Sequence, residues 1–411
     1  MRILIFGEAF LPPAYLPRTR YFCTYLLEKG WEIDFVFESS KDQNYVPDNT
    51  SALSIDYYKS KSPFTAKIEW VVKFILNLIY DYKGRYFYRH SNFFIDEKQY
   101  NLVFCSSSFT FPLTTAAMVA KKKNIPLIVD LRDIIEQSPD DNHYIANKSP
   151  KIFGNLLTNI YKSINLTRRN KTLKIAAGIT TVSPWHVQTL SKYNKNTHLI
   201  YNGFDETKFT PEIIKTDRFT ISYFGRVYNE NMRNPKLLFQ ALQVLITNGT
   251  ITEQNTTIKW FVDENSRNVI KKIASDFGLD NLNEYHDFVK PENLLTEMNK
   301  SSILLVLCNI ATKKKYYGIM TTKFFEAIGV NRPVLCIPNN NDHLSELIKE
   351  TNCGLVSSEN DDVESFLRHN FAEWLKTGHT TGTLQESVRM NFSRRKGAEL
   401  LEKLFLNTMK N

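Results

Sequence analysis

Short apolar runs alternate with segments of helical periodicity along most of the chain. In the first half, runs with the length of a buried strand lie at residues 2–6, 32–37, 102–105, 127–129 and 178–182. Segments with the i, i+3, i+4 spacing of a helix that covers a sheet lie between them, at 20–28 and 112–122. This alternation is typical of a parallel sheet with crossover helices.

The second half repeats the scheme. Predicted strands lie at 220–224, 257–262, 303–307 and 333–337, and predicted helices at 235–247, 264–277 and 322–328. The join is the turn-rich stretch Tyr201-Asn202-Gly203-Phe204-Asp205. We therefore predict an α/β protein with two Rossmann-like, doubly wound domains, residues 1–204 and 205–390, that face each other across a cleft. Ligands of such folds bind beyond the carboxyl ends of the strands.

The segment 67–82 interrupts this pattern because it is apolar almost all round its helix. It also lies in a basic window, with Lys59, Lys61, Lys67, Lys73, Lys83, Arg85 and Arg89 against Glu69 and Asp81. One interpretation is an interfacial helix that rests on anionic lipid. The other is a buried helix with a solvated basic end, and the sequence leaves both open.

Length and cysteine content agree with an intracellular, two-domain protein. A chain of 411 residues fits two domains of about 200 residues each. The five cysteines are scattered, without the spacing of a zinc or redox motif, which favours buried thiols in a reducing cytoplasm. The first apolar run is too short for a signal peptide, and no run reaches the length of a membrane-spanning helix.

The net charge of +9 is concentrated in the first half. Residues 1–205 hold 26 Lys and Arg against 18 Asp and Glu, and the remainder holds 26 against 25. This asymmetry indicates that one domain meets an anionic partner: a membrane surface, a phosphate-bearing acceptor or nucleic acid. Nucleic acid is disfavoured because the basic residues are not interleaved with aromatic residues in a known binding motif.

The first candidate site follows the predicted strand 220–224. Gly225 allows the backbone to turn sharply beside a ligand, and Arg226 projects after it. Arg233 precedes Pro235, which suits the first position of a helix. Two guanidinium groups near a helix N-terminus predict a diphosphate site, and the alternative is two surface arginines near a loop.

The second candidate site is the loop and helix that begin at Gly318. Thr321, Thr322 and Lys323 form the first turn of the predicted helix, where backbone N–H groups and the helix dipole favour phosphate oxygens. Glu326 lies one turn further on a mostly apolar helix, and its carboxylate suits recognition of a ribose diol.

These two stretches, in this order, resemble the GT-B-fold glycosyltransferases of family 4. Other parts of the chain are similar to motifs of the same family: Pro12-Pro13 with Arg20, Asp130-Leu131-Arg132-Asp133, Thr181-Val182-Ser183, Tyr201–Asp205, and the helix predicted near the end of the chain. The resemblance implies that residues 391–411 form a helix that crosses back to the first domain.

The resemblance also implies roles for individual residues. Arg226 matches the arginine that binds the donor diphosphate, and Arg233 falls where the family usually has a lysine. Glu326 matches the glutamate that holds the ribose. Val289 belongs to a loop similar to the one that contacts the nucleotide base through its backbone. Gly318 stands where the family has a glutamate that contacts the donor sugar.

The family retains anomeric configuration without an obvious enzymic nucleophile and needs no metal ion or other cofactor. The resemblance therefore implies a charge-stabilising cleft in place of paired carboxylates. Asp133, or Glu8, would then position or deprotonate an acceptor hydroxyl. The alternative is that Asp130, Arg132 and Asp133 anchor a loop by local hydrogen bonds. The family's glycine pair after the first strand is replaced here by Ala14-Tyr15-Leu16-Pro17.

We thus expect a retaining transferase that moves a sugar from a nucleotide-diphosphate sugar to a saccharide or lipid-linked acceptor for a bacterial surface polysaccharide. It would work in the cytoplasm or at the inner face of the cell membrane. Two alternatives remain: an inactive, donor-binding subunit of a membrane-associated synthesis complex, and a nucleotide-sugar epimerase. A dehydrogenase is disfavoured because Phe6-Gly7-Glu8-Ala9 lacks the three-glycine fingerprint.

Overall fold

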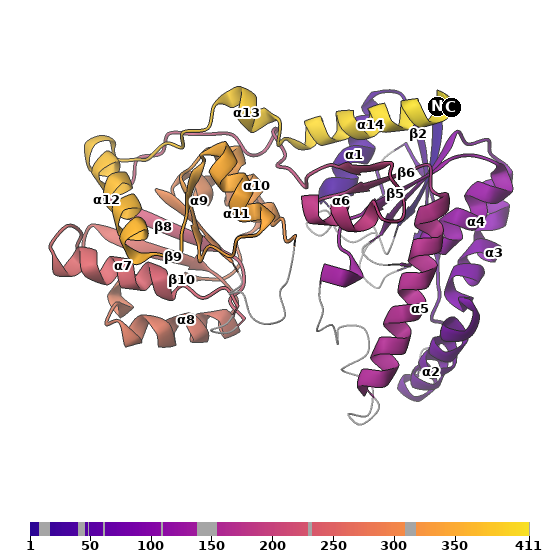
Figure 1. Ribbon diagram of the computed structural model, residues 1–411, viewed down its shortest axis with the longest axis horizontal. Coiled ribbons are helices and arrows are strands. Elements are labelled where there is room, and N and C mark those ends of the chain that lie inside the picture. The colour runs from indigo at the N-terminus through magenta and orange to yellow at the C-terminus, as the bar shows by residue number, and fades with distance from the viewer. Residues whose placement is uncertain are drawn as a thin grey trace. The chain divides into compact units, whose positions relative to one another are not determined.

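The computed structural model divides the chain into two compact units. Contacts group Met1–Tyr201 with Gly397–Asn411 as the first unit and Asn202–Lys396 as the second. The structure describes residues 1–7, 17–39, 46–47, 49–60, 62–107, 110–137, 154–228, 232–308 and 318–410. Each unit is an α/β domain built on a parallel sheet (Figure 1).

The sheet of the first unit has the order β3-β2-β1-β4-β5-β6-β7, and all described pairings are parallel. Its strands are β1 (Arg2–Gly7), β2 (Glu32–Glu38), β3 (Ser51–Ile55), β4 (Leu102–Ser107), β5 (Leu127–Leu131), β6 (Gly178–Thr181) and β7 (Thr197–Leu199). Every residue of β4 and β5 is buried, as apolar central strands require when helices cover both faces. The strand order reverses at β1, which is the position where this fold class binds ligands.

Two groups of helices cover the faces of this sheet. The helices are α1 (Pro17–Glu28), α2 (Pro63–Tyr80), α3 (Tyr82–Asp96), α4 (Leu113–Lys123), α5 (Gly154–Ile175), α6 (Pro184–Leu190) and α14 (Arg394–Lys410). One core joins the sheet to α3, α4 and the end of α5, and the other joins it to α1 and α14. In the second core, Phe405 packs edge-on to Phe104 at 5.3 Å. The last helix thus completes the core of the first unit.

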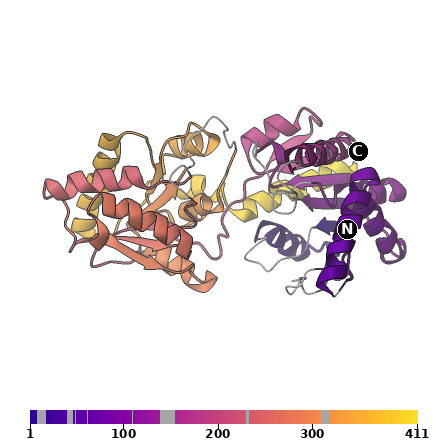
Figure 2. The same cartoon turned by 90° about the horizontal axis from the view of Figure 1, so that it is seen from below.

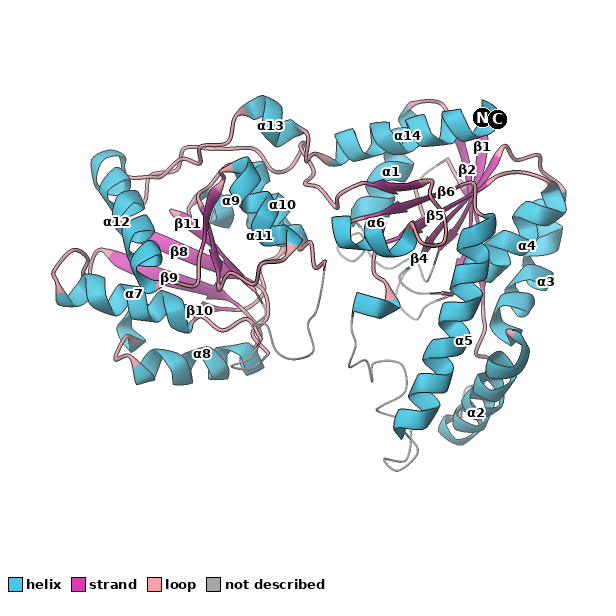
Figure 3. Ribbon diagram, viewed as in Figure 1, coloured by secondary structure: helices cyan, strands magenta, loops and turns pink. Residues whose placement is uncertain are grey.

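The second unit repeats the architecture with the strand order β10-β9-β8-β11-β12-β13. Its strands are β8 (Phe219–Phe224), β9 (Thr256–Phe261), β10 (Asn283–His286), β11 (Ile303–Leu307), β12 (Val334–Ile337) and β13 (Gly354–Val356). Its helices are α7 (Lys236–Thr247), α8 (Glu264–Asp276), α9 (Pro291–Asn299), α10 (Thr322–Val330), α11 (His343–Thr351), α12 (Asn360–Thr377) and α13 (Glu386–Met390). Figure 3 colours these strands and helices separately, and Figure 2 turns the view by 90°.

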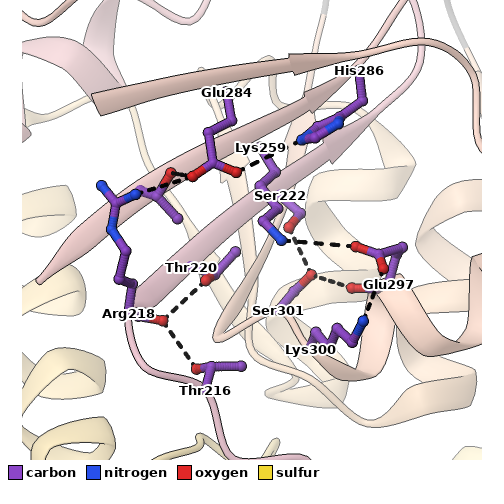
Figure 4. A network of polar contacts seen from close by, with 11 residues as sticks. Thr216, Arg218, Thr220, Ser222, Lys259, Glu284, His286, Glu297, Lys300 and Ser301 are labelled. Carbon is purple, nitrogen blue, oxygen red and sulfur yellow. Dashed lines mark hydrogen bonds and ion pairs between the residues drawn. The ribbon is translucent and has the colours of Figure 1, made fainter. Parts of the chain in front are cut away.

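A polar network fastens the β10 edge of this second sheet (Figure 4). Glu284 of β10 pairs with Arg218 at 3.0 Å and accepts a hydrogen bond from Thr257 at 3.0 Å. Lys259 of β9 lies 3.9 Å from Glu297 of α9. The contacts of Glu284 tie β10 to β9 and to the residue before β8, and the Lys259 contact ties β9 to α9.

The predicted fold class is confirmed, and the structure adds elements that the pattern did not reveal. The structure contains the predicted strands of both halves, from 2–6 to 178–182 and from 220–224 to 333–337. It also contains β3, α3 and α5, which were not predicted. The predicted helix 67–82 begins earlier, at Pro63, and ends at Tyr80. None of its residues is buried, so the buried-helix interpretation is wrong. Glu8 and the segment 12–16, named above as candidates, lie outside the described residues.

The described helices were also compared with the length and hydropathy that a membrane crossing requires. None of them is both long enough and apolar enough to span a bilayer.

Candidate active site

The sharp turn at the carboxyl end of β8 depends on Gly225. A Cβ at this position would occupy the space taken by the ammonium group of Lys323, and it would lie 3.1 Å from the Tyr223 hydroxyl. The backbone of the turn and the ammonium of Lys323 therefore approach each other directly, and a side chain at residue 225 would displace that ammonium. β8 and the start of α10 thus meet at one point of the second unit.

Arg226 is held from two sides and still reaches solvent. Its Nε pairs with the Asp263 carboxylate at 3.0 Å, and its guanidinium lies 5.5 Å from the centre of the Phe288 ring. Asp263 is the N-cap of α8 and accepts a hydrogen bond from the Ser266 N–H at 2.8 Å. Hydrogen bonds from Ser266, and then the charge of Arg226, lower the pKa of Asp263. The arginine side chain is 56% exposed, so its remaining donors are available to a ligand.

Arg233 belongs to the same turn. Its backbone is in the left-handed region, with φ of 62°. One of its terminal nitrogens donates to the carbonyl of Arg226 at 3.2 Å, and the Tyr223 hydroxyl donates to the same carbonyl at 2.8 Å. Its guanidinium lies 5.3 Å from the centre of the Tyr228 ring. The two arginines are therefore tied together through one backbone carbonyl.

The first turn of α10 adds a third cation and a carboxylate. Thr321 is the N-cap and makes no side-chain capping bond, and Thr322 and Lys323 follow it. Burial, then the positive charges of Arg233 and Arg226, lower the pKa of Lys323 to about 8, and Glu326 partly opposes the shift. Burial raises the pKa of Glu326 to about 7, against the effects of Arg394 and Lys323. Both shifts disfavour the charged forms of Lys323 and Glu326, and such perturbed pKa values are common in functional sites.

These side chains line one pocket of the second unit. It contains Gly225, Arg226, Arg233, Lys323 and Glu326, together with Val289 and the aromatic residues Phe224, Tyr228, Phe261 and Phe288. Phe261 stacks on Phe224 at 4.6 Å and on His286 at 5.0 Å, which makes an apolar wall beside the cations. A cluster of cations, one carboxylate and an aromatic wall match the phosphates, sugar and base of a nucleotide.

A second pocket adjoins the first through Arg233 and Lys323. It is also lined by Thr321, Asp342 and apolar residues of β11. Asp342 is the N-cap of α11 and accepts the N–H of Gly318 at 2.9 Å and that of His343 at 2.8 Å. Asp342 thus supplies the carboxylate of this second pocket, and Gly318, which has no side chain, donates its backbone N–H to that carboxylate.

Asp133 belongs to the first unit, whereas the residues that line the pocket belong to the second. It follows β5, is exposed, and has a pKa that desolvation raises against the opposing effect of Arg132. Asp130 differs from it because its carboxylate is buried, 3.0 Å from Arg18 and 2.6 Å from the Thr180 hydroxyl. Asp130 is therefore a structural anchor, whereas the raised pKa of Asp133 shows a carboxyl that is partly desolvated although the residue as a whole is exposed.

The sequence analysis missed Asp263, Phe288 and Asp342. Asp263 and Asp342 each directly precede an amphipathic helix, a position where an N-cap is expected. An N-cap pattern does not show that Asp263 also pairs with Arg226, or that Asp342 also lines a pocket. Phe288 neighbours the predicted Val289. Among the described residues, no cluster of three or more side chains suited to a metal ion was found.

Comparison with known proteins identifies the fold. No model of a known family matches the sequence, and no curated protein matches it. Solved structures do match: HepE of Anabaena in complex with UDP has a TM-score of 0.62 at 11% identity over 99% of this chain and 100% of that one. A glycosyltransferase of Rickettsia africae has a TM-score of 0.63 at 15% identity over 100% and 99%.

WaaG, a glycosyltransferase involved in lipopolysaccharide biosynthesis, has a TM-score of 0.54 at 12% identity over 97% of this chain and 99% of its own. The chain has the GT-B fold. At such low identities the likeness establishes the architecture over the whole length of the chain, and the chemistry must be argued from the residues of the pocket.

Proposed function

We propose that this protein is a retaining glycosyltransferase that takes a sugar from a nucleotide-diphosphate donor. The observation that supports this most is the cluster of Arg226, Arg233 and Lys323 at the N-terminus of α10, with Glu326 one turn away. The three cations repel one another when the pocket is empty, and a diphosphate would relieve that repulsion. Two solved structures of the same fold contain UDP or UDP-glucose, which agrees with a nucleotide-sugar donor.

In the proposed reaction, the bond between the anomeric carbon and the diphosphate breaks, and negative charge develops on the leaving nucleotide. Arg226, Arg233 and Lys323 would neutralise this charge, and they would stabilise the transition state more than the ground state because the charge grows during the reaction. Thr321 and Thr322 would bring backbone N–H groups to the phosphates. These groups would serve the reaction with no metal ion or other cofactor.

Glu326 would accept the ribose hydroxyls, since an ionised carboxylate can accept hydrogen bonds from two adjacent hydroxyl groups. The base would lie near the aromatic wall and contact the backbone at Val289. Asp133, in the first unit, would position or deprotonate the acceptor hydroxyl, because a carboxyl with a raised pKa is the stronger base.

The acceptor we propose is a saccharide or a lipid-linked saccharide for a bacterial surface polysaccharide, used in the cytoplasm at the inner face of the membrane. The basic first half supports an anionic surface or a phosphate-bearing acceptor. WaaG, of the same fold, is involved in lipopolysaccharide biosynthesis.

The alternative that a specific observation favours is a donor-binding subunit without activity. Gly318 has no side chain to offer to a donor sugar, and its N–H is already held by Asp342. In this alternative, nucleotide binding persists and sugar transfer does not occur.

The first test is thermal unfolding with a panel of nucleoside diphosphates. A ligand at about 100 times its dissociation constant stabilises a protein by about 2.7 kcal/mol. We expect one diphosphate to stabilise the wild type and Arg226→Ala and Glu326→Ala to lose the effect. Arg368→Ala, which removes an arginine of α12 with 47% exposure, should keep it. If no diphosphate stabilises the wild type at millimolar concentration, the proposed function is wrong.

The second test separates the two functions. With the stabilising nucleotide carried on a labelled sugar, transfer to membrane saccharide extracts would support the transferase, and NMR of the first-formed product would report whether the anomeric configuration is retained. Donor binding without transfer or donor hydrolysis would favour the inactive subunit.

A further inference from the structure

Helix α2 turns its polar side toward the protein and its apolar side toward solvent. The inner side carries Glu69, Lys73 and Asn77, spaced four residues apart, so they form one line along the helix. Glu69 pairs with Lys73 at 2.6 Å and accepts the backbone N–H of Ser60 at 2.9 Å. Lys73 donates to the Tyr57 carbonyl and lies 4.5 Å from the centre of the Tyr57 ring. This line of polar groups therefore fixes which side of the helix faces the protein.

The opposite side presents a continuous apolar stripe to solvent. The exposed residues follow the i, i+3, i+4 spacing of one helix face: Phe64 at 73%, Ile68 at 50%, Val71 at 42%, Val72 at 49%, Ile75 at 49% and Ile79 at 72%. An amphipathic helix of a globular domain normally buries its apolar face. Exposed apolar stripes of this length mark interaction sites in folded proteins.

Helix α5 extends this surface. Phe74 of α2 stacks on Tyr161 of α5 at 5.6 Å, and Arg168 of α5 donates to the carbonyls of Asn77 and Leu78 at 2.6 and 3.0 Å. The same part of α5 exposes Leu156 at 60% and Ile160 at 42%. Figure 1 shows α2 and the N-terminal part of α5 at the same end of the first unit.

The charges around the stripe are almost all positive. The part of α5 that contacts α2 carries Lys162 and Arg168, and Arg168 lies 3.9 Å from the Asp81 carboxylate at the end of α2. The carboxylate within α2, Glu69, is paired with Lys73. Lys59, Lys67, Arg85 and Arg89 are exposed on or near α2. Two copies of such a face would repel each other, so a second copy of this chain is a poor occupant. An anionic surface is attracted by the same charges.

We propose that the outer face of α2, with the N-terminal part of α5, docks the protein on an anionic lipid surface. The apolar stripe enters the boundary between headgroups and acyl chains, and the surrounding Lys and Arg contact lipid phosphates. This deepens the membrane contact included in the proposed function by naming the surface and the lipid chemistry. Docking through α2 leaves the donor pocket of the second unit chemically untouched, so the two proposals are tested by different variants.

The experiment is sedimentation of the full chain with vesicles of phosphatidylcholine alone and of phosphatidylcholine mixed with phosphatidylglycerol. We expect binding to the anionic vesicles and little to the neutral ones. The double variant Ile75→Ser/Ile79→Ser should bind about 100-fold more weakly, at about tenfold for each lost side chain. Ile213→Ser, an equally drastic change at a residue of the second unit that is 74% exposed, should bind as the wild type does.

Circular dichroism and the nucleoside-diphosphate thermal shift accompany each variant. A folded double variant that keeps the thermal shift and loses vesicle binding supports the proposal. Equal binding of the double variant and Ile213→Ser overturns it, as does a wild type that ignores anionic vesicles. A wild-type dimer in the ultracentrifuge that the double variant dissociates, without vesicle binding, also overturns it in favour of a second copy. Vesicle binding without any diphosphate response would refute the proposed function and leave this surface standing.

Discussion

Replacing Lys323 by methionine should make the empty protein more stable while it removes donor binding. Lys323 is surrounded by Arg226 and Arg233, and its ammonium lies directly against the backbone at Gly225. Methionine has a similar length, fills the same space and carries no charge. The substitution therefore removes the repulsion within the cation cluster without opening a large cavity.

The size of the effect follows from the pKa of Lys323. A pKa lowered from 10.5 to about 8 corresponds to about 3 kcal/mol of destabilisation of the charged form, at about 1.4 kcal/mol per unit. The side chain keeps partial solvent access, and the variant also loses the cation–π contact with Tyr223 at 5.7 Å, so we expect a net gain of about 1–2 kcal/mol.

The pH dependence has a definite sign. The folded-state pKa lies below the unfolded one, so the destabilisation is complete below pH 8 and is relieved as the pH rises from about 8 toward 10.5. The stability difference between variant and wild type should therefore be largest near neutral pH and shrink in alkaline solution. The same substitution should raise the pKa of Glu326 further, because it removes the positive charge of Lys323 that lowers this pKa.

The assay is urea unfolding of wild type and Lys323→Met at neutral and alkaline pH, each with and without the stabilising nucleoside diphosphate. Lys403→Met, at an exposed lysine of α14, is the matched control and should change stability little. A Lys323→Met variant that is less stable than the wild type at neutral pH, or a gain that persists unchanged above pH 10, would refute the electrostatic reasoning.

Three further predictions follow from the same structure. Gly225→Ala should weaken diphosphate binding at least about tenfold by displacing the ammonium of Lys323, whereas Gly249→Ala, where a Cβ meets nothing within 4 Å, should leave binding unchanged in the same titration calorimetry. Donor affinity of the wild type should fall as the pH rises above 8, where Lys323 loses its charge, by up to about tenfold per pH unit; calorimetry in buffers of different ionisation enthalpy should detect proton uptake on binding, and a pH-independent affinity would contradict this role. Asp130→Ala should destabilise the first unit by about 3–5 kcal/mol, because it leaves the buried guanidinium of Arg18 without its carboxylate. Denaturant unfolding should show a much smaller effect of Asp96→Asn, which removes an exposed ion pair, and equal effects of the two changes would count against the prediction.

The periodicity of the chain was sufficient to predict the sheets because buried parallel strands are apolar at nearly every position. β5 and β11 are buried along their whole length, so their apolar runs could be assigned as strands without knowing which strands pair with them. α3 and α5 were missed because they have low mean hydropathy. The buried positions of α3 have helical spacing, but two of them are Gly84 and Ser91, so the apolar pattern that predicts a helix is incomplete. Their helical state depends on packing against the sheet more than on a local pattern.

The candidate pocket of the second unit was predictable only in part for a similar reason. Arg226, Lys323 and Glu326 lie beside sequence features with a local signature, a strand end with glycine and a helix start. Asp263, which pairs with Arg226, and Asp342, which lines the adjoining pocket, come from other loops, and no local signature connects them to these partners. Parallel topology brings the carboxyl ends of separate strands to one edge, so these partners are known only once the strand order is known.

Helix α2 shows the same division between local and tertiary information. The sequence alone determined that the segment is helical, strongly apolar and flanked by basic residues. It could not determine which side faces the protein, because a helix that is apolar almost all round has no unique inner face. The tertiary structure decided this through Glu69 and Lys73, whose charges find partners at Ser60 and Tyr57. These polar contacts, together with the stack of Phe74 on Tyr161, turn one side of the helix toward the protein, and the apolar stripe faces solvent.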